Sequence, residues 1–152
     1  MNNIKIEQIK KQHHTEIRRI MKSLDKWFDE NALNSIVIDL KYHKGYTAKD
    51  KDNIVGFITY FVYEGIGNIG WIGVKQDYQN NKIGRKLIER IENDLKKDGI
   101  NILQVYTLSD SVEYEPYEKT RKFYYNNGFK EYRRVKTNNP SCPEELYLRK
   151  QF

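Results

Sequence analysis

The clearest pattern of hydrophobic and polar positions lies between residues 68 and 99. Residues 68–74 (NIGWIGV) are apolar and rich in β-branched and aromatic side chains, which is typical of a buried strand. A polar turn follows, and apolar residues then recur at helical spacing as one stripe: Ile83, Leu87, Ile88, Ile91 and Leu95. Gly99 comes after the stripe, where a residue without a Cβ ends helices in the left-handed conformation. The stretch predicts a strand, a turn and a helix.

Before this stretch, the pattern predicts one strand and two helices. Ile4 and Ile6 alternate with polar residues, as in a short strand. Thr15 is placed to cap a helix whose apolar residues are Ile17, Ile20, Met21 and Leu24. Residues 30–43 contain SIVIDL, which favours a strand by propensity, but their apolar positions fall at helical spacing. We therefore interpret this segment as a second helix, ended by Gly45.

The remaining segments predict further strands and one more helix. Residues 46–49 and 54–64 form a hairpin across a polar turn at 50–53, and residues 65–67 turn into the central strand. After the central helix come a strand at 100–108, an acidic loop at 109–116, a helix at 117–127, and strands at 129–136 and 145–150. Strands alternating with helices in this order predict a single α/β (α+β) domain over residues 1–152, with a mixed sheet and helices on both faces.

Composition narrows the function classes only a little. The chain has 27 basic and 21 acidic residues, a net charge of +6, which fits an anionic cofactor, an acidic partner or nucleic acid. Cys142 is the only cysteine, which excludes an internal disulfide and fits a reducing compartment. No apolar run approaches a membrane span and the N-terminus lacks the apolar core of a signal peptide, so we expect a cytoplasmic protein. His13, His14 and His43 have no metal-ligand spacing, so no metal is assigned.

The turn at residues 79–84, between the central strand and helix, is a candidate anion site. At such a turn the first N–H groups of the helix are free and the helix dipole is positive. Gly84 lets a ligand approach the backbone closely, and Lys82 and Arg85 add positive charge. We therefore expect a phosphate or pyrophosphate there, although an ordinary β–α connection has the same appearance when it stands alone.

Two segments resemble the GNAT superfamily of acyl-CoA N-acyltransferases. Residues 71–88 (WIGVKQDYQNNKIGRKLI) are similar to its acyl-CoA motif, a strand followed by Q/R-x-x-G-x-G/A. Residues 117–129 (YEKTRKFYYNNGF) resemble its second motif, a helix with a Tyr just before a Gly-Phe turn. The order of elements is similar over nearly the whole chain. The resemblance implies the GNAT fold, with a mixed, mostly antiparallel sheet of about seven strands. It also implies transfer of an acetyl group from acetyl-CoA to an amine.

The resemblance also assigns site residues. It implies a pyrophosphate loop at Gln79, Asn80, Asn81, Lys82, Ile83 and Gly84, with Arg85 adding charge. It implies a pantetheine site along the strand at Trp71, Ile72, Gly73 and Val74. Tyr124, four residues before Gly128, falls at the general-acid position. Three residues depart from the family pattern. Lys82 replaces the usual first Gly, Asn68 stands where some members have a general-base Glu, and Tyr117 stands where many have an Asn that contacts the cofactor.

The implied reaction needs a base and an acid. An amine with a pKa of ~10 attacks a thioester only as the free base, so a carboxylate, a histidine or a water chain must take its proton. The leaving thiolate needs a proton, and Tyr124 is our candidate donor, although a tyrosine in an apolar helix is usually a core residue. Glu64, Glu113 and Glu115 are candidate bases, each of which is equally a solvated surface charge. A water chain without a dedicated base is a further alternative.

The sequence leaves the acceptor open. Asp110, Glu113 and Glu115, together with Tyr114, would attract a cationic amine: a polyamine, an aminoglycoside, or a lysine or N-terminus of a peptide. The alternative function is a non-catalytic module that binds acyl-CoA or a basic partner. Nucleic-acid binding through the basic residues in 118–122 and 130–136 is a lesser alternative. A homodimer fits the family, and no membrane partner is expected.

Overall fold

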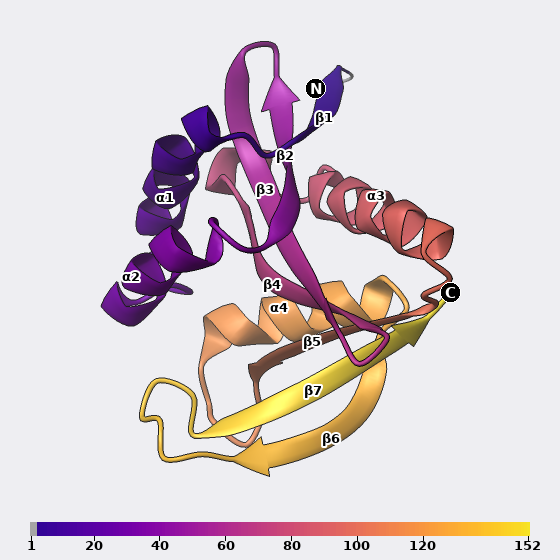
Figure 1. The fold of residues 1–152 in the computed structure, drawn as a ribbon. Coiled ribbons are helices and arrows are strands. Elements are labelled where there is room, and N and C mark those ends of the chain that lie inside the picture. Colours follow the sequence, from indigo (N-terminus) through magenta and orange to yellow (C-terminus); the bar gives the residue numbers. More distant parts are fainter. Residues whose placement is uncertain (1–2) are drawn as a thin grey trace.

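The computed structural model describes residues 3–152, which form one seven-stranded sheet flanked by helices (Figure 1). In chain order the elements are β1 (Ile4–Gln8), a 3₁₀ turn (Lys11–His13), α1 (His14–Ser23), α2 (Glu30–Asp39), β2 (Lys44–Asp50), β3 (Asn53–Tyr63), β4 (Ile66–Val74), a 3₁₀ turn (Gln76–Tyr78), α3 (Ile83–Lys97), β5 (Ile102–Leu108), α4 (Glu115–Asn126), β6 (Lys130–Lys136) and β7 (Glu144–Gln151). The strand order is β1-β2-β3-β4-β5-β7-β6, and neighbours pair antiparallel except β4 and β5, which are parallel. This mixed, mostly antiparallel sheet confirms the predicted fold class.

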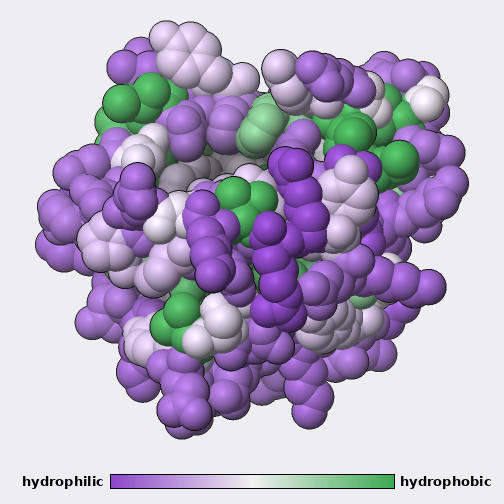
Figure 2. All heavy atoms as spheres, turned by 90° about the horizontal axis from the view of Figure 1, so that it is seen from below, coloured by the Kyte–Doolittle hydropathy of each residue, from purple (hydrophilic) through white to green (hydrophobic). Residues whose placement is uncertain are grey.

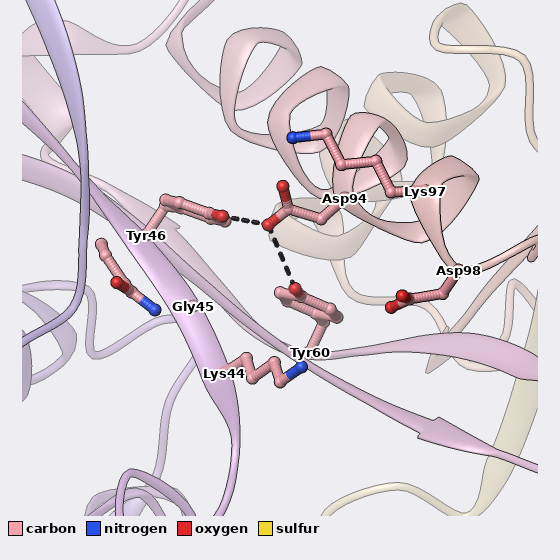
Figure 3. Close-up of a pocket in the computed structure, with 8 residues that line it drawn as sticks. Lys44, Gly45, Tyr46, Tyr60, Asp94, Lys97 and Asp98 are labelled. Carbon is pink, nitrogen blue, oxygen red and sulfur yellow. Dashed lines mark hydrogen bonds between the residues drawn. The ribbon is translucent and has the colours of Figure 1, made fainter.

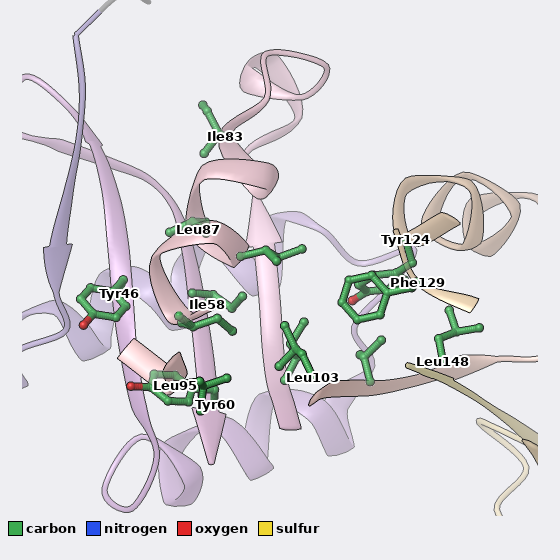
Figure 4. Close-up of a cluster of buried hydrophobic side chains, with 14 of the residues drawn as sticks. Tyr46, Ile58, Tyr60, Ile83, Leu87, Leu95, Leu103, Tyr124, Phe129 and Leu148 are labelled. Carbon is green, nitrogen blue, oxygen red and sulfur yellow. The ribbon is translucent and has the colours of Figure 1, made fainter. Parts of the chain in front are cut away.

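Helices cover both faces of the sheet, α1 and α2 on one and α3 and α4 on the other (Figure 1). The predicted stripe of α3 is the centre of the larger core, and each of its members is 0% or 1% exposed: Ile83, Leu87, Ile88, Ile91 and Leu95. This core extends from Tyr46 and Tyr60 to Tyr124 and Phe129 beside α4 (Figure 4). A smaller core around Phe57 lies under α1 and α2.

β4 and β5 are paired only near their beginnings. Gly67 pairs with Leu103 and Asn68 with Gln104, and no further pair joins these strands within residues 3–152. β5 continues along β7 instead, while the rest of β4 is paired on its β3 side alone. The two strands then run in different directions (Figure 1). We call the point at Asn68 and Gln104 the fork. Beyond it, one edge of β4 has no strand partner among the described residues.

A bulge follows the fork directly. Thr59 of β3 faces two residues of β4, Gly70 and Trp71, because the pairing shifts by one residue there. An extra residue in one strand re-aims the side chains around it. Trp71 points toward α2, where its indole Nε1 donates to Asp39 Oδ2 over 2.7 Å. The N–H of Trp71, displaced from the ladder, donates to Thr59 Oγ1 over 2.9 Å.

The predicted element order is confirmed, but the predicted end of the second helix was wrong. SIVIDL is helical, as its spacing indicated, yet α2 ends at Asp39 and the chain turns through residues 40–43. Gly45 does not end a helix, because it lies inside β2. A Cβ there would lie 2.3 Å from the carbonyl oxygen of Ile58, so this glycine allows β2 to approach β3 closely.

Two turns also differ from the prediction. Thr15 does not cap α1; it is the second residue of the helix, which follows the 3₁₀ turn, and His13 stands at the N-cap position. The turn before β4 contains only Glu64 and Gly65, both with positive φ (51° and 76°), so the strand begins at Ile66. The other strand and helix ends move by one or two residues.

The surface is mostly polar. The face seen from below in Figure 2 is dominated by hydrophilic side chains, with separate small hydrophobic patches between them. Within residues 3–152, no helix is long and apolar enough to cross a membrane.

Candidate functional site

The loop between β4 and α3 leaves the first amides of α3 free. The N–H groups of Ile83, Gly84 and Arg85 have no acceptor among the described residues, and the first bond into the helix runs from Lys86 N–H to Lys82 O, 3.0 Å. Free amides at the positive end of a helix dipole attract phosphate oxygens. This geometry is that of an anion site.

Polar side chains of the loop bind its own backbone. Gln79 Nε2 donates to Val74 O over 3.0 Å, and Asn81 Nδ2 donates to Gln79 O over 3.0 Å. Asn80 and Lys82 both take left-handed backbone conformations, with φ of 65° and 62°. When left-handed residues alternate with right-handed ones, the backbone amides turn to one side of the loop, as in backbone nests. The loop therefore satisfies its carbonyls internally and keeps the amides of α3 available.

Gly84 lies against the aromatic ring of Phe123 on α4. A Cβ at position 84 would lie 2.7 Å from Phe123 Cζ and 2.9 Å from its Cε1. The sequence analysis attributed this glycine to the approach of a ligand. The structure adds a packing reason, because the neighbouring helix also requires a residue without a Cβ here, and the contact with a ligand stays a prediction.

Tyr124 lies next to this contact in the larger core. It is 3% exposed and packs edge-to-face with Phe123 and Phe129, both at 5.3 Å between ring centroids. Its hydroxyl makes no hydrogen bond within residues 3–152. Burial raises the pKa of Tyr124 above its ordinary value, and nearby Tyr117 raises it further, so the phenol is protonated at neutral pH. Tyr125, its neighbour in sequence, is exposed.

Comparison with known families agrees with this geometry. A family model described as the acetyltransferase (GNAT) domain matches residues 41–131, which include the β4–α3 loop and Tyr124. The chain belongs to the GNAT acetyltransferase family. No curated protein matches the chain.

Solved structures of GNAT proteins are similar over nearly all of the chain. A GNAT-family protein from Desulfovibrio desulfuricans has a TM-score of 0.83 at 21% identity, covering 98% of this chain and 99% of that one. The ribosomal-protein-S18-alanine N-acetyltransferase of Escherichia coli has a TM-score of 0.78 at 14% identity, covering 98% and 94%. A GNAT acetyltransferase from Elizabethkingia anophelis with acetyl-CoA bound has a TM-score of 0.78 at 18% identity, covering 100% of both chains. At these identities the similarity establishes a shared fold.

Lys82 departs from the GNAT motif but keeps the conformation of a glycine. Its φ of 62° and ψ of 17° are left-handed, which costs a residue with a Cβ roughly 1–2 kcal/mol. Its side chain is exposed and makes no hydrogen bond or ion pair with a described residue, so its charge is free at the start of α3. Arg85, one turn further, pairs with Glu89 over 3.2 Å.

Tyr117 joins α4 to the loop between α1 and α2. Its hydroxyl donates to Trp27 O over 2.8 Å, and Trp27 Nε1 donates to Pro116 O over 3.0 Å and to Thr120 Oγ1 over 3.1 Å. Burial raises the pKa of Tyr117 to about 12. Its hydroxyl is therefore used within the protein, and a contact with the cofactor stays a prediction.

Two carboxylates that sequence reasoning missed lie near Tyr106 on β5. Tyr106 pairs with Tyr147 of β7, whose hydroxyl donates to Glu145 Oε1 over 3.0 Å, and Asp39 of α2 accepts from the indole of Trp71. Burial raises the pKa of Tyr106, and the charges of Glu145 and Asp39 raise it further. Neither forms an ion pair with a lysine or arginine in residues 3–152. Asp110, which the sequence analysis favoured instead, is neutralised by Arg134 at 2.6 Å. No local motif marks the first two because they come from different elements, α2 and β7.

Cys142 also lies near this group, although it is remote from both motifs in the sequence. A thiolate at Cys142 would raise the pKa values of Tyr106 and Tyr117. Burial and Glu145 raise the pKa of the Cys142 thiol, which therefore stays protonated at neutral pH. A thiol in that state is a poor nucleophile. On β5, the hydroxyl of Thr107 is buried without a hydrogen-bond partner in the described residues.

Two cavities lie beside α3. The first, about 230 Å³, is near its C-terminal end, where the hydroxyls of Tyr46 and Tyr60 both donate to Asp94 Oδ2 (Figure 3). Lysines and acids alternate around it, and the tyrosines connect β2 and β3 to the helix, which indicates a structural role. The second, about 300 Å³, extends from Arg85 to Gly128 at the end of α4. Across the described residues, no group of three or more His, Cys, Asp or Glu is placed to hold a metal ion.

Proposed function

We propose that this protein transfers an acetyl group from acetyl-CoA to a primary amine by direct attack in a ternary complex. The observation that carries the proposal is the unpaired edge of β4 beyond the fork, which leads to the free amides at the start of α3. An extended pantetheine arm fits an unpaired strand edge, and a pyrophosphate fits a helix N-terminus. Membership of the GNAT family supports the same assignment.

The cofactor would be held by the residues that the sequence analysis named. Trp71, Ile72, Gly73 and Val74 supply the strand backbone, and residues 79–84 supply the loop. Lys82 and Arg85 bring positive charge to the phosphates. Backbone N–H groups near Val74 would donate to the oxyanion of the tetrahedral intermediate.

Tyr124 would return a proton to the sulfur of coenzyme A. A thiol has a pKa of ~8.5 and an ordinary phenol ~10, and burial moves this phenol further upward. Tyr124 is therefore protonated whenever a thiolate leaves. Because its hydroxyl has no acceptor among the described residues, it is available to the leaving sulfur.

The acceptor would be a cationic amine. Glu145 and Asp39, two carboxylates without a basic partner in the described residues, lie near Tyr106, and an ammonium ion is favoured beside carboxylates and aromatic faces. We expect Glu145→Gln to raise the KM for the amine while the Kd for acetyl-CoA stays the same. Glu118→Gln, an exposed residue of α4, is the matched control.

Calorimetric titration with acetyl-CoA and with CoA tests the donor site. We expect binding to the native protein and a loss of at least about tenfold in the variant Lys82→Glu/Arg85→Glu, because both changes reverse charge at the helix N-terminus. Lys11→Glu/Lys136→Glu has the same net charge, and both of its positions are exposed and lie on other elements. Equal losses in the two variants would refute the assigned loop.

Release of free thiol with a panel of amines tests the reaction. Transfer by the native protein would support an N-acetyltransferase. Tight binding of acetyl-CoA without thiol release from any amine would favour the non-catalytic acyl-CoA-binding module.

A further inference from the structure

The proposed reaction needs a group that takes the proton of the amine, and the fork does not supply one. Asn68 stands there, and its Oδ1 accepts from Gln104 Nε2 over 3.1 Å. Neither amide takes up a proton near neutral pH. Glu64 lies in the exposed turn of the β3–β4 hairpin, Glu113 is exposed just before α4, and Glu115 is the exposed first residue of α4. A base must therefore come from another element.

We propose that His43 is the general base of this protein, an assignment that rests on the proposed function. His43 is the last residue before β2, and its ring covers β4 at Gly70, within the bulge. A Cβ at position 70 would lie 2.7 Å from His43 Nδ1 and 2.8 Å from its Cε1. The imidazole thus occupies the place of a side chain on β4, two residues beyond Asn68.

The ring of His43 is held from two sides. It stacks on Phe61 with centroids 4.9 Å apart, and Nδ1 lies 3.3 Å from Thr59 Oγ1. The same hydroxyl oxygen accepts the N–H of Trp71 at the bulge. We assign the proton of the neutral ring to Nδ1, so that Thr59 Oγ1, with its two lone pairs, accepts from both Nδ1 and the N–H of Trp71. In that tautomer Nε2, which bonds no residue in 3–152, keeps its lone pair for the amine.

The surroundings of His43 favour its neutral form. Burial lowers the pKa of His43, and the charge of Asp39 on α2 partly opposes that shift. Phe61 on β3 and Gly70 on β4, which face the ring from the sheet, carry no charge. A neutral imidazole at pH 7 is ready to accept a proton, as a general base must be.

The steps balance as follows. Nε2 of His43 accepts one proton from the ammonium group, either directly or through a water, and the freed lone pair attacks the thioester carbon. The new C–N bond forms, the C–S bond breaks, and the proton of Tyr124 goes to sulfur. The second proton lost by the nitrogen restores Tyr124 through solvent, and His43 releases its proton to solvent. The products are an N-acetylated amine, CoA thiol and one proton.

The test is the pH profile of kcat/KM for the best amine of the panel, measured on the full chain with His43→Gln. We expect kcat/KM of the native protein to fall at acidic pH with an apparent pKa below 6.5. This decrease adds to the one caused by protonation of the amine substrate itself. The kcat/KM of the variant should be about 100-fold lower at pH 7, and the decrease with an apparent pKa below 6.5 should be absent. Its Kd for acetyl-CoA should match that of the native protein, which shows that the fold and the donor site persist.

Two further variants make the outcome decisive. His14→Gln changes a histidine in the first turn of α1 and should leave the profile unchanged. His43→Ala should regain activity with added imidazole, which a purely structural role for the ring does not predict. A His43→Gln variant that keeps both its rate and its acidic limb would overturn the assignment. No thiol release by the native protein would instead refute the proposed function.

Discussion

Replacing Lys82 by glycine should stabilise the protein, which is unusual for a change to glycine beside a helix. Lys82 is held at φ 62° and ψ 17°, a conformation that costs a residue with a Cβ roughly 1–2 kcal/mol. Glycine avoids that cost but loses more conformational freedom on folding, by roughly 0.5–1 kcal/mol. The free energy of unfolding should therefore rise by about 0.5–1 kcal/mol. For a domain of this size that corresponds to an increase in Tm of about 1–4 °C.

Lys86→Gly is the matched control for this prediction. It removes the same side chain four residues later, inside α3, where glycine costs about 1 kcal/mol. Tm from differential scanning calorimetry should therefore move in opposite directions for the two variants. A fall in Tm for both would refute the left-handed strain at Lys82. Titration of Lys82→Gly with CoA then isolates the contribution of the lysine charge, because the backbone of the loop is retained.

Three other predictions concern stability, activity and pH. Asp94→Ala should lower the free energy of unfolding by about 2 kcal/mol in urea denaturation, because two tyrosine hydroxyls lose a charged acceptor. The side chain of Asp98 accepts no hydrogen bond from a described residue, so Asp98→Ala should cost less than about 0.5 kcal/mol. Tyr124→Phe should leave Tm unchanged, since the hydroxyl has no partner in the described residues, and should lower kcat about 100-fold. Lys49 and Lys5 lower the pKa of Glu7 to about 2, so Glu7 adds stability that is complete above its ordinary pKa of 4.5 and is lost as the pH falls through 2. Glu7→Gln should therefore be less stable than the native protein at pH 6, and the difference should shrink as the pH falls to 2 and vanish below it.

The central part of the fold was predictable because its signals are local. The stripe of α3 and the apolar strand before it lie within one continuous stretch of sequence. The side-chain repeats of a helix and of a strand follow directly from the geometry of each element. SIVIDL was a harder case, since β-branched residues favour strands. The spacing of Leu33, Ile36 and Leu40 overrode that propensity, and all three are buried.

The remainder was not predictable because it depends on contacts between distant segments. Gly45 looks like the end of a helix until β3 is seen to lie against it, and the packing of Gly84 on Phe123 becomes visible only when α3 and α4 are placed side by side. The bulge at residues 70–71 leaves no trace in the apolar pattern. His43 was noted in the sequence only as lacking metal-ligand spacing, and its position over β4 arises from the turn after α2.

The bulge of β4 connects these long-range features. Thr59 satisfies the N–H of Trp71 that the bulge removes from the ladder, so this donor is not left unpaired. The same hydroxyl contacts His43, and the indole of Trp71 is bound by Asp39. On its other side, β4 has no strand partner beyond the fork in the part of the chain that the structure describes. In the proposed function, one short segment of strand thus offers its open edge to the acyl donor while its α2 side carries the polar groups that the amine needs, and a regular ladder on both sides would remove both properties at once.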